Sequence, residues 1–435
     1  MAFCTTALRI HLLIYLYLVF VVSLSAKLSS YNSLTITQSQ PFPRVNKIVL
    51  GKPHLCKFTG LKIAVNTRLL LQGNLLGIGR YIHETTRRMV LSHPEDEFHF
   101  FFDRPFDQQF IYADNVIPHV LSPPSRHPFL WYLWFEWAVP RKLKSIDAEV
   151  FYSGDMNLSL KTKVPTVLVS HDLGYEHYPE HIPWLASKYY RHYFPKYHRA
   201  ASTLITVSES TKKDVIQLYG IPSEKITVAT NATPPGFRAL NESEKKIIRN
   251  KLADGAPYFV FIGSLHPRKN LARLLAAFDL FKEETDAPHK LVIYGPQFFK
   301  TDDIFETHQK MKYKADVIFT NDGDYTVPDV LGASTALCFI SLFEGFGIPI
   351  VEAFAAEVPV ITSTISAMPE VAGDAALLVD PQDVSKIKDA LCLIYSDDKL
   401  CASLIAKGKE RKNLFSWDKT AEQVYQALKT SSQLT

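Results

Sequence analysis

Two carboxylates, two glycines and a proline lie within nine residues, from Glu344 to Glu352. Proline is favoured at the first position of a helix, so we expect a helix to begin near Pro349. An apolar run at residues 336–340 precedes this stretch and is typical of a buried strand. The glycines would then lie in a strand-to-helix turn, where backbone N–H groups can approach an anion closely. Such a loop could bind a sugar, a diphosphate and a ribose together.

A second cluster, residues 263–270, contains two adjacent cations, Arg268 and Lys269, before an expected helix that begins after Asn270. Cations are electrostatically unfavourable at a helix N-terminus, because the helix dipole favours anions there. A bound diphosphate would remove the conflict, since both side chains suit phosphate. The alternative is a pair of solvated surface cations with little energetic effect. Asn270 is the expected N-cap of the helix.

Two further candidates lie in the first half of the chain. Gly77 and Gly79 precede an expected helix, although a Gly-x-Gly alone is also an ordinary turn. His171 follows the expected strand 166–170, where a histidine can face a ligand or fill a core position. Asp322–Asp324 has the composition of a turn. The aromatic tracts 129–137 and 184–199 are interpreted as helices that pack inward, with contact to a membrane interface as the alternative.

Apolar strand-like and helix-like segments alternate from residue 61 onward, which is typical of doubly wound α/β domains. The expected strands are residues 63–66, 98–102, 149–152, 166–170, 203–207 and 226–229, then 258–262, 291–294, 317–319, 336–340, 359–361 and 376–379. Pro234, Pro235 and Gly236 interrupt the alternation and indicate a linker. We therefore expect two Rossmann-like domains, at 60–235 and 236–415, that face a cleft, and a terminal helix within 416–435 that crosses back to the first domain.

Composition excludes some classes of protein. The net charge of +4 over 435 residues gives no case for nucleic-acid binding. The five cysteines have no metal-binding spacing, and their number indicates a reducing compartment without disulfides or zinc. Residues 10–25 are mostly apolar, so residues 1–59 are an extension ahead of the folded part or a non-native start, a membrane anchor, or a secretion signal.

The motifs resemble glycosyltransferase family 4, a family of retaining enzymes with the GT-B architecture, and especially its bacterial mannosyl- and glucosyltransferases. The resemblance extends from about residue 62 to 427. It is strongest at residues 263–270, 343–352, 359–363 and 368–376. Two residues depart from the family pattern. Ser264 stands where many relatives have an arginine, and Glu357 stands where a glycine is common.

The resemblance implies a role for each matching position. Arg268 and Lys269 would bind the donor diphosphate, and Glu352 the donor ribose. Glu344, together with the backbone of Gly345, Phe346 and Gly347, would contact the donor sugar and phosphate, and His171 the transferred sugar. Gly77 and Gly79 would allow a loop of the first domain to close over the site, and Gly263 would lie beside the donor. No metal or cofactor is expected.

The expected activity is transfer of a hexose from a nucleotide diphosphate sugar to a glycan or lipid-linked acceptor, in polysaccharide biosynthesis. The expected location is the cytoplasm, either free or peripherally associated with the inner face of the membrane. One alternative on the same fold is a non-hydrolysing nucleotide-sugar epimerase, which would need an acid/base pair of its own in the cleft. The other is a non-catalytic protein that binds a nucleotide or a glycan.

Overall fold

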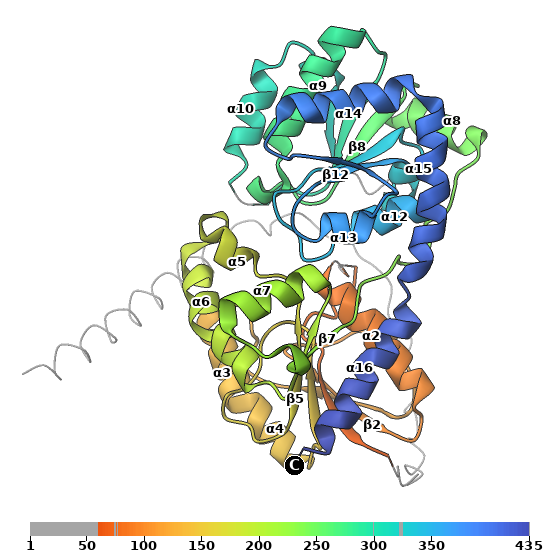
Figure 1. Ribbon diagram of the computed structural model, residues 1–435. Coiled ribbons are helices and arrows are strands. Elements are labelled where there is room, and N and C mark those ends of the chain that lie inside the picture. The colour runs from red at the N-terminus through yellow and green to blue at the C-terminus, as the bar shows by residue number, and fades with distance from the viewer. Residues whose placement is uncertain (1–59, 74, 76, 299, 322–324, 435) are drawn as a thin grey trace, which may run out of the picture. The chain divides into compact units, whose positions relative to one another are not determined.

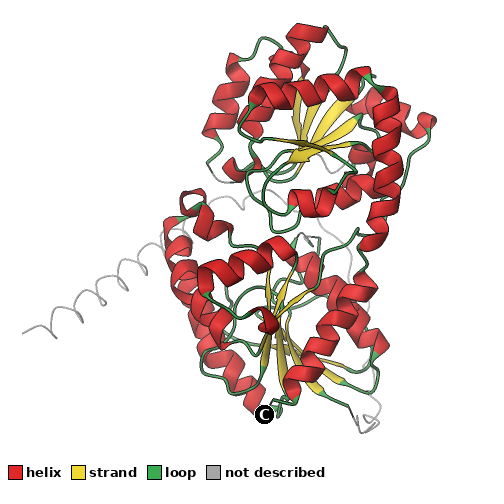
Figure 2. Ribbon diagram, viewed as in Figure 1, coloured by secondary structure: helices red, strands yellow, loops and turns green. Residues whose placement is uncertain are grey.

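The computed structural model describes residues 60–434, except 74, 76, 299 and 322–324. The strands in these ranges form two sheets in which every pairing is parallel (Figures 1 and 2). Residues 1–59 and the predicted turn at Asp322–Asp324 lie outside the described residues. The predicted fold class, two doubly wound parallel-sheet domains, is confirmed.

The first sheet has the strand order β3-β2-β1-β4-β5-β6-β7. Its strands are β1 (Lys62–Asn66), β2 (Glu97–Phe102), β3 (Val116–Val120), β4 (Val150–Ser153), β5 (Thr166–Ser170), β6 (Thr203–Thr206) and β7 (Ile226–Val228). The helices that follow or precede them are α2 (Ile78–Ser92), α3 (Pro128–Leu133), α4 (Val139–Ser145), α5 (Gly174–His177), α6 (Trp184–Ala200) and α7 (Glu209–Tyr219). A π-helical turn, Trp134–Ala138, joins α3 to α4.

The second sheet has the order β10-β9-β8-β11-β12-β13. Its strands are β8 (Tyr258–Ile262), β9 (Lys290–Tyr294), β10 (Val317–Thr320), β11 (Ala336–Phe339), β12 (Val360–Ser363) and β13 (Leu377–Val379). Its helices are α8 (Glu242–Ala253), α9 (Leu271–Thr285), α10 (Asp302–Lys310), α11 (Val327–Gly332), α12 (Ile348–Ala356), α13 (Met368–Ala372), α14 (Val384–Ser396) and α15 (Asp398–Arg411). Buried aliphatic and phenylalanine side chains of both sheets belong to one continuous core cluster.

Strand β3 was missing from the sequence prediction. Pro118 lies in its middle, and proline lowers the expectation of a strand because it cannot donate to the ladder. The structure places β3 at the edge of the sheet, where it pairs with β2 alone. One side of an edge strand needs no N–H donor, so the proline is tolerated there.

The last helix, α16 (Trp417–Ser432), packs on α2 and on strands β4 to β6 of the first sheet (Figure 1). Its Tyr425 ring stacks on His93 with centroids 3.4 Å apart, and the Tyr425 hydroxyl donates to Asp96 at 2.8 Å. Arg88 of α2 pairs with Asp418 at 2.6 Å. In the described ranges, no helix combines the length and the hydropathy that a membrane crossing requires.

Candidate functional site

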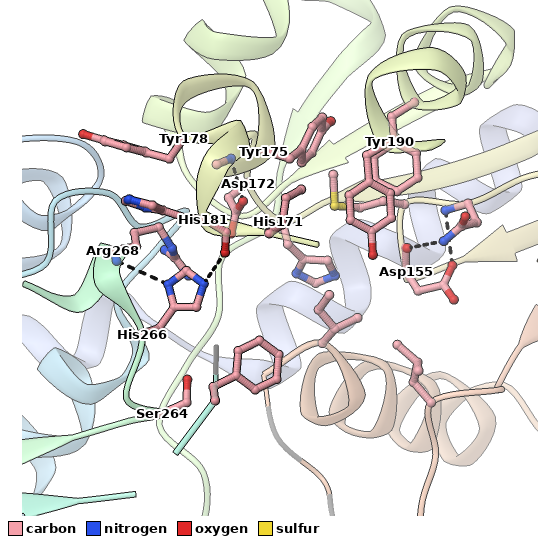
Figure 3. Close-up of a pocket in the computed structure, with 18 of the residues that line it drawn as sticks. Asp155, His171, Asp172, Tyr175, Tyr178, His181, Tyr190, Ser264, His266 and Arg268 are labelled. Carbon is pink, nitrogen blue, oxygen red and sulfur yellow. Dashed lines mark hydrogen bonds between the residues drawn. The ribbon is translucent and has the colours of Figure 1, made fainter. Parts of the chain in front are cut away.

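A pocket of about 570 Å³ is lined by residues of the loops and helices that follow strands of both sheets (Figure 3). Arg68, Asp155 and His171 follow strands β1, β4 and β5 of the first sheet. Arg268 and Lys269 follow β8 of the second sheet. The carboxyl ends of parallel strands are where doubly wound sheets bind ligands, and β1/β4 and β8 lie where the strand order reverses. The pocket is therefore the candidate active site.

The two adjacent cations are held by one carboxylate. Lys269 Nζ lies 2.7 Å from one oxygen of Glu344, and an Arg268 guanidinium nitrogen lies 3.1 Å from the other. Arg268 also donates to the carbonyl oxygen of Phe343. The three side chains are largely buried, with 10–21% of each exposed. The cluster therefore has a net charge of +1 next to the pocket.

Burial alone would raise the pKa of Glu344, but Arg268 and Lys269 lower it to about 2. Glu344 is thus ionised at neutral pH. Burial lowers the pKa of Lys269, an effect that Glu344 opposes. Burial also acts to lower the pKa of Arg268, but the attraction of Glu344 outweighs it and raises that pKa. The carboxylate thus opposes the loss of charge that burial favours in both cations, as an ion pair of good geometry can.

Asn270 occupies the position before α9 but does not cap it with its side chain. Its backbone is left-handed, with φ of 63°, and a short 3₁₀ turn, Pro267–Lys269, precedes it. The side-chain amide instead donates to the carbonyls of Ile340 and Pro381, at 3.1 and 2.7 Å. The predicted side-chain cap is therefore wrong. Asn270 ties the cationic turn to the segments after β11 and β13.

The glycine-containing turn joins the two halves of the site. A Cβ atom on Gly345 would lie 1.8 Å from the carbonyl oxygen of His171, so only glycine allows this approach. The Gly345 carbonyl accepts hydrogen bonds from Ser208 at 2.6 Å and from Thr211 at 3.2 Å. Gly347 has φ of 102°, in the left-handed region that favours glycine. Helix α12 begins one residue before the predicted position.

The backbone N–H groups of Gly345, Phe346 and Gly347 have no hydrogen-bond acceptor in the described part of the chain. They precede the first turn of α12, where the helix dipole adds partial positive charge. The Phe346 side chain is buried and packs edge-on against Phe415, with centroids 5.4 Å apart. The turn thus offers amide donors and no charged side chain of its own except Glu344.

Glu352 lies on α12 and is partly buried. Burial raises its pKa to about 7, and Arg80 of α2 opposes the rise. Among the described residues, no hydrogen bond or ion pair reaches its carboxyl group, which agrees with the raised pKa. A group in this state can accept hydrogen bonds from a bound ligand.

His171 is neutral and oriented. Its Nε2–H donates to the Gly154 carbonyl at 2.8 Å, and because a carbonyl only accepts, the proton is on Nε2. Burial lowers its pKa, while the Gly154 carbonyl and Asp172 oppose the shift. The Tyr81 ring packs edge-on against the imidazole, 5.2 Å between centroids. The unprotonated Nδ1 is available to accept a hydrogen bond from a ligand hydroxyl.

Of the predicted site residues, His171, Arg268 and Lys269 line the pocket, and Glu344 contacts it through the two cations. The other predicted site residues are not among the described residues that line the pocket: Gly77, Gly79, Gly263, Gly345, Phe346, Gly347 and Glu352. Gly77 has φ of 45° at the start of α2. A Cβ on Gly79 would lie 2.7 Å from the Leu69 carbonyl, and Gly263 has φ of 143°.

Sequence reasoning missed the ion pair between Arg68 and Asp155. The Asp155 carboxylate is almost fully buried, and the Arg68 guanidinium lies 5.5 Å from the centre of the Phe135 ring. Asp172 and Tyr190 of the pocket were missed as well. Arg68 and Asp155 each follow a predicted strand closely. The rule that selected His171, a polar residue at the carboxyl end of a strand, would have found them.

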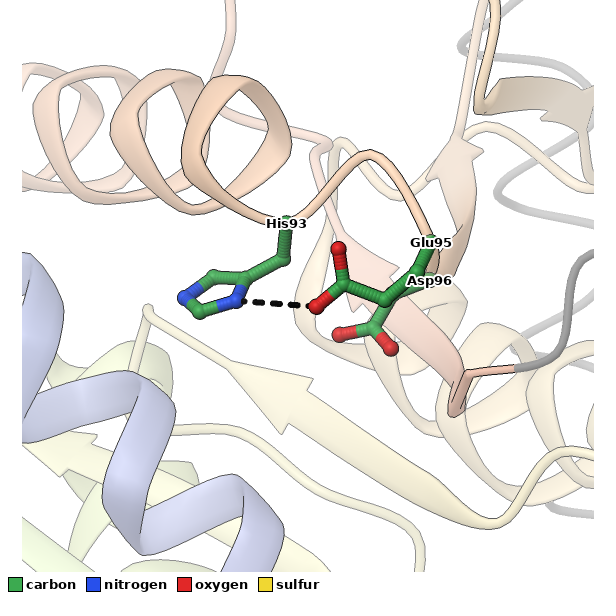
Figure 4. A group of neighbouring side chains, drawn as sticks. All are labelled: His93, Glu95 and Asp96. Carbon is green, nitrogen blue, oxygen red and sulfur yellow. Dashed lines mark hydrogen bonds and ion pairs between the residues drawn. The ribbon is translucent and has the colours of Figure 1, made fainter.

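One group in the described part of the chain has a metal-like geometry: ligand atoms of His93, Glu95 and Asp96 lie within 4.8 Å of one another (Figure 4). Asp96 already accepts hydrogen bonds from the Leu61 N–H at 2.7 Å and from Tyr425. His93 already stacks on Tyr425. We interpret the group as the anchor of α16 on the first domain.

Comparison with known proteins gives two family matches. Residues 76–236 match the model for Glycosyltransferase Family 4, and residues 242–411 match the model for Glycosyl transferases group 1. O-antigen chain mannosyltransferase B of Escherichia coli is 25% identical, over 82% of this chain and 96% of its own length. O-antigen chain mannosyltransferase RfbU of Salmonella typhimurium is 26% identical, over 64% of this chain and 76% of its own.

Solved structures with the same fold include Anabaena Alr3699/HepE in complex with UDP and glucose. It is 17% identical with a TM-score of 0.65, and the match covers 85% of this chain and 100% of that one. WaaG, a glycosyltransferase involved in lipopolysaccharide biosynthesis, is 16% identical with a TM-score of 0.64, over 84% of this chain and 99% of its own. At these identities the likeness concerns the fold.

Proposed function

We propose that this chain, a member of glycosyltransferase family 4 with the GT-B architecture, transfers a hexose from a nucleotide diphosphate sugar to a hydroxyl of a glycan or lipid-linked acceptor. The observation that carries the proposal is the cluster of Arg268, Lys269 and Glu344. It adjoins a pocket that also contains His171. A positive cluster beside a pocket of this size suits a donor whose leaving group is a diphosphate.

Transfer requires the bond between the sugar C1 and the diphosphate oxygen to break, which adds negative charge to the diphosphate. Arg268 and Lys269 would stabilise that charge, and the free amides ahead of α12 would add hydrogen bonds. These interactions strengthen as the charge develops, so they lower the barrier more than they lower the energy of the bound donor. Glu344 would hold the two cations in place, in addition to its expected contact with the donor sugar.

Two residues would fix the rest of the donor. Glu352, with its raised pKa, would accept hydrogen bonds from the ribose hydroxyls. The Nδ1 atom of His171 would accept one from the transferred hexose. Such contacts hold the anomeric carbon near the acceptor hydroxyl, which supplies much of the rate by orientation.

We propose that transfer retains the configuration of the sugar. A new bond forms between C1 and the acceptor oxygen on the face that the diphosphate leaves. The acceptor proton passes to an oxygen of the departing phosphate, so no protein base is needed. We also expect the reaction to proceed without a metal, with Arg268 and Lys269 supplying the positive charge.

The relatives suggest the substrates. Two of them are O-antigen chain mannosyltransferases, and Alr3699/HepE was solved with UDP and glucose, so we propose a hexose of the mannose or glucose type. The acceptor would be a growing glycan or a lipid-linked precursor of a polysaccharide. Nucleotide sugars are made in the cytoplasm, so the protein would act there, on the inner side of the membrane.

The test has two stages. A thermal-shift screen with GDP-mannose, UDP-glucose and UDP-N-acetylglucosamine identifies the donor, because a ligand that binds only the folded state raises its melting temperature. Proton NMR of the product then gives the anomeric configuration. The variants Arg268→Ala and Lys269→Ala should each lower turnover by about 100-fold or more, whereas Lys399→Ala, an exposed cation on α15, should not. Near-normal turnover in both site variants, or an inverted product, would refute the proposal.

A further inference from the structure

The outer side of α3 and α6 exposes large aromatic residues. Trp184 is 68% exposed and Phe129 is 64% exposed, and Leu185 is exposed beside Trp184. The two helices lie side by side (Figure 1) and line a groove of about 660 Å³. The groove is lined by His127, Pro128, Phe129, Tyr132, Leu185, Lys188, Tyr189, His192 and Tyr193. We call the residues of this groove, together with Trp184 and Lys196, the α3/α6 face.

The α3/α6 face departs from the inward packing predicted for the aromatic tracts. Part of each tract is buried as predicted: Trp134 and Tyr197 are fully covered, and Trp131 and Tyr190 line the active-site pocket. The two helices therefore carry aromatic residues on two sides, toward the protein and toward solvent. The prediction of inward packing is right for the buried side of the two helices and wrong for the exposed side. The sequence does not show how much of a helix surface packs against the rest of the protein.

The face is also positively charged. Helix α6 contains no aspartate or glutamate, and its exposed cations include Lys188 and Lys196. Lys188 lies 4.1 Å from the centre of the Trp184 ring, and Lys196 lies 5.6 Å from that of Tyr193. Arg191 is the one α6 cation in the described chain that pairs with a carboxylate, Glu176 at 3.1 Å. The other cations of α6 form no ion pair with a carboxylate in the described ranges.

We propose that the α3/α6 face docks on an anionic lipid bilayer. Tryptophan and phenylalanine partition into the interface between water and acyl chains, and neighbouring lysines attract anionic head groups. A protein partner would be expected to match the positive charge with a complementary acidic surface. Binding to an anionic bilayer requires only cationic side chains and apolar side chains that can enter the lipid. The inner side of the same two helices lines the active-site pocket through Trp131 and Tyr190. Docking would thus hold the pocket close to the membrane surface.

The test uses the full-length chain and vesicles of phosphatidylcholine, with and without phosphatidylglycerol. Cosedimentation should depend on the anionic lipid and decrease with salt. The variants Phe129→Ser/Trp184→Ser and Lys188→Gln/Lys196→Gln should each weaken binding by about tenfold. The matched controls on α8, Ile247→Ser and Lys246→Gln/Lys251→Gln, should not; Ile247 is 56% exposed. All variants should keep their activity on a water-soluble acceptor.

A second measurement reports on the face itself. Lipids brominated on their chains should quench the fluorescence of Trp184, obtained as the difference between the wild type and Trp184→Phe. No quenching of Trp184 would refute the proposal even if the chain sediments with vesicles, because another segment would then bind the lipid. Equal sedimentation of the face variants and the α8 controls would also refute it. So would loss of a dimer, rather than of vesicle binding, in Phe129→Ser/Trp184→Ser.

Discussion

The variant Glu352→Gln should change the stability of the protein and its affinity for the donor in opposite directions. Burial raises the pKa of Glu352 from 4.5 to about 7. The folded state therefore holds a proton that the unfolded state releases above pH 4.5. It follows that the carboxyl group lowers the stability progressively as the pH rises from 4.5 to 7, and that the full cost is present above pH 7.

The size of the effect follows from the pKa values. One pKa unit corresponds to about 1.4 kcal/mol, so the cost reaches about 3 kcal/mol well above pH 7. Between pH 5.5 and pH 8 it grows by about 2 kcal/mol. Glutamine does not ionise, so the variant avoids this cost. The variant should gain stability relative to the wild type by about 2 kcal/mol over that interval.

The assay is thermal or guanidinium unfolding of both proteins at pH 5.5 and pH 8, with Glu410→Gln, an exposed residue of α15, as the control. Nucleotide binding should change in the opposite direction. If Glu352 accepts hydrogen bonds from a ribose, glutamine should weaken nucleotide affinity about tenfold or more. If the stability difference between the wild type and Glu352→Gln does not change with pH, the claim that burial raises the pKa of Glu352 is refuted. Unchanged nucleotide affinity would refute its role in the site.

Three further variants probe neighbouring contacts. Gly345→Ala should lower kcat/KM at least about tenfold, because its Cβ would meet the His171 carbonyl at 1.8 Å; wild-type kinetics would show that this approach is not needed for turnover. In acid unfolding, the contribution of Glu344 to the stability of the wild type should decline as the pH falls from 4.5 toward 2. Glu344→Gln should therefore be less stable than the wild type at pH 7, and its stability should depend less on pH in the acid range. Glu370→Ala removes the carboxylate that accepts from the α7 N–H groups of Glu209 and Ser210, at 2.8 and 2.9 Å, and should lower the melting temperature by a few degrees; an unchanged value would mean that water replaces the cap.

Much of the fold could be predicted because its signals are local. Buried parallel strands are continuous apolar runs, and Ser208, a residue type favoured at helix N-caps, caps α7 by accepting from the Thr211 N–H at 2.9 Å. Edge strand β3 was missed because Pro118 argues against a strand unless its place in the sheet is known. Local patterns give the elements, but the order of strands depends on pairings between distant segments.

The site could be predicted in part. The motifs selected Arg268, Lys269 and Glu344. They did not show that one carboxylate holds both cations, because Glu344 lies 75 residues after Lys269 in the chain. The pair of Arg68 and Asp155 spans 87 residues and was missed for the same reason. The raised pKa of Glu352 depends on burial beside α2, which composition does not reveal. Long-range contacts thus determine the charge state of residues that local sequence patterns identify only as candidates.

The central claim, that Arg268 and Lys269 bind the diphosphate of the donor, is tested most directly by calorimetric titration. The quantity is the ratio of Kd for a nucleoside to Kd for its diphosphate, because this ratio isolates the phosphate contribution from that of the base and ribose. In the wild type it should be about 100 or more, since charge-assisted hydrogen bonds contribute about 1.5–3 kcal/mol each. In Lys269→Gln it should fall at least about tenfold, with the affinity for the nucleoside unchanged. An equal ratio in the two proteins would contradict the account.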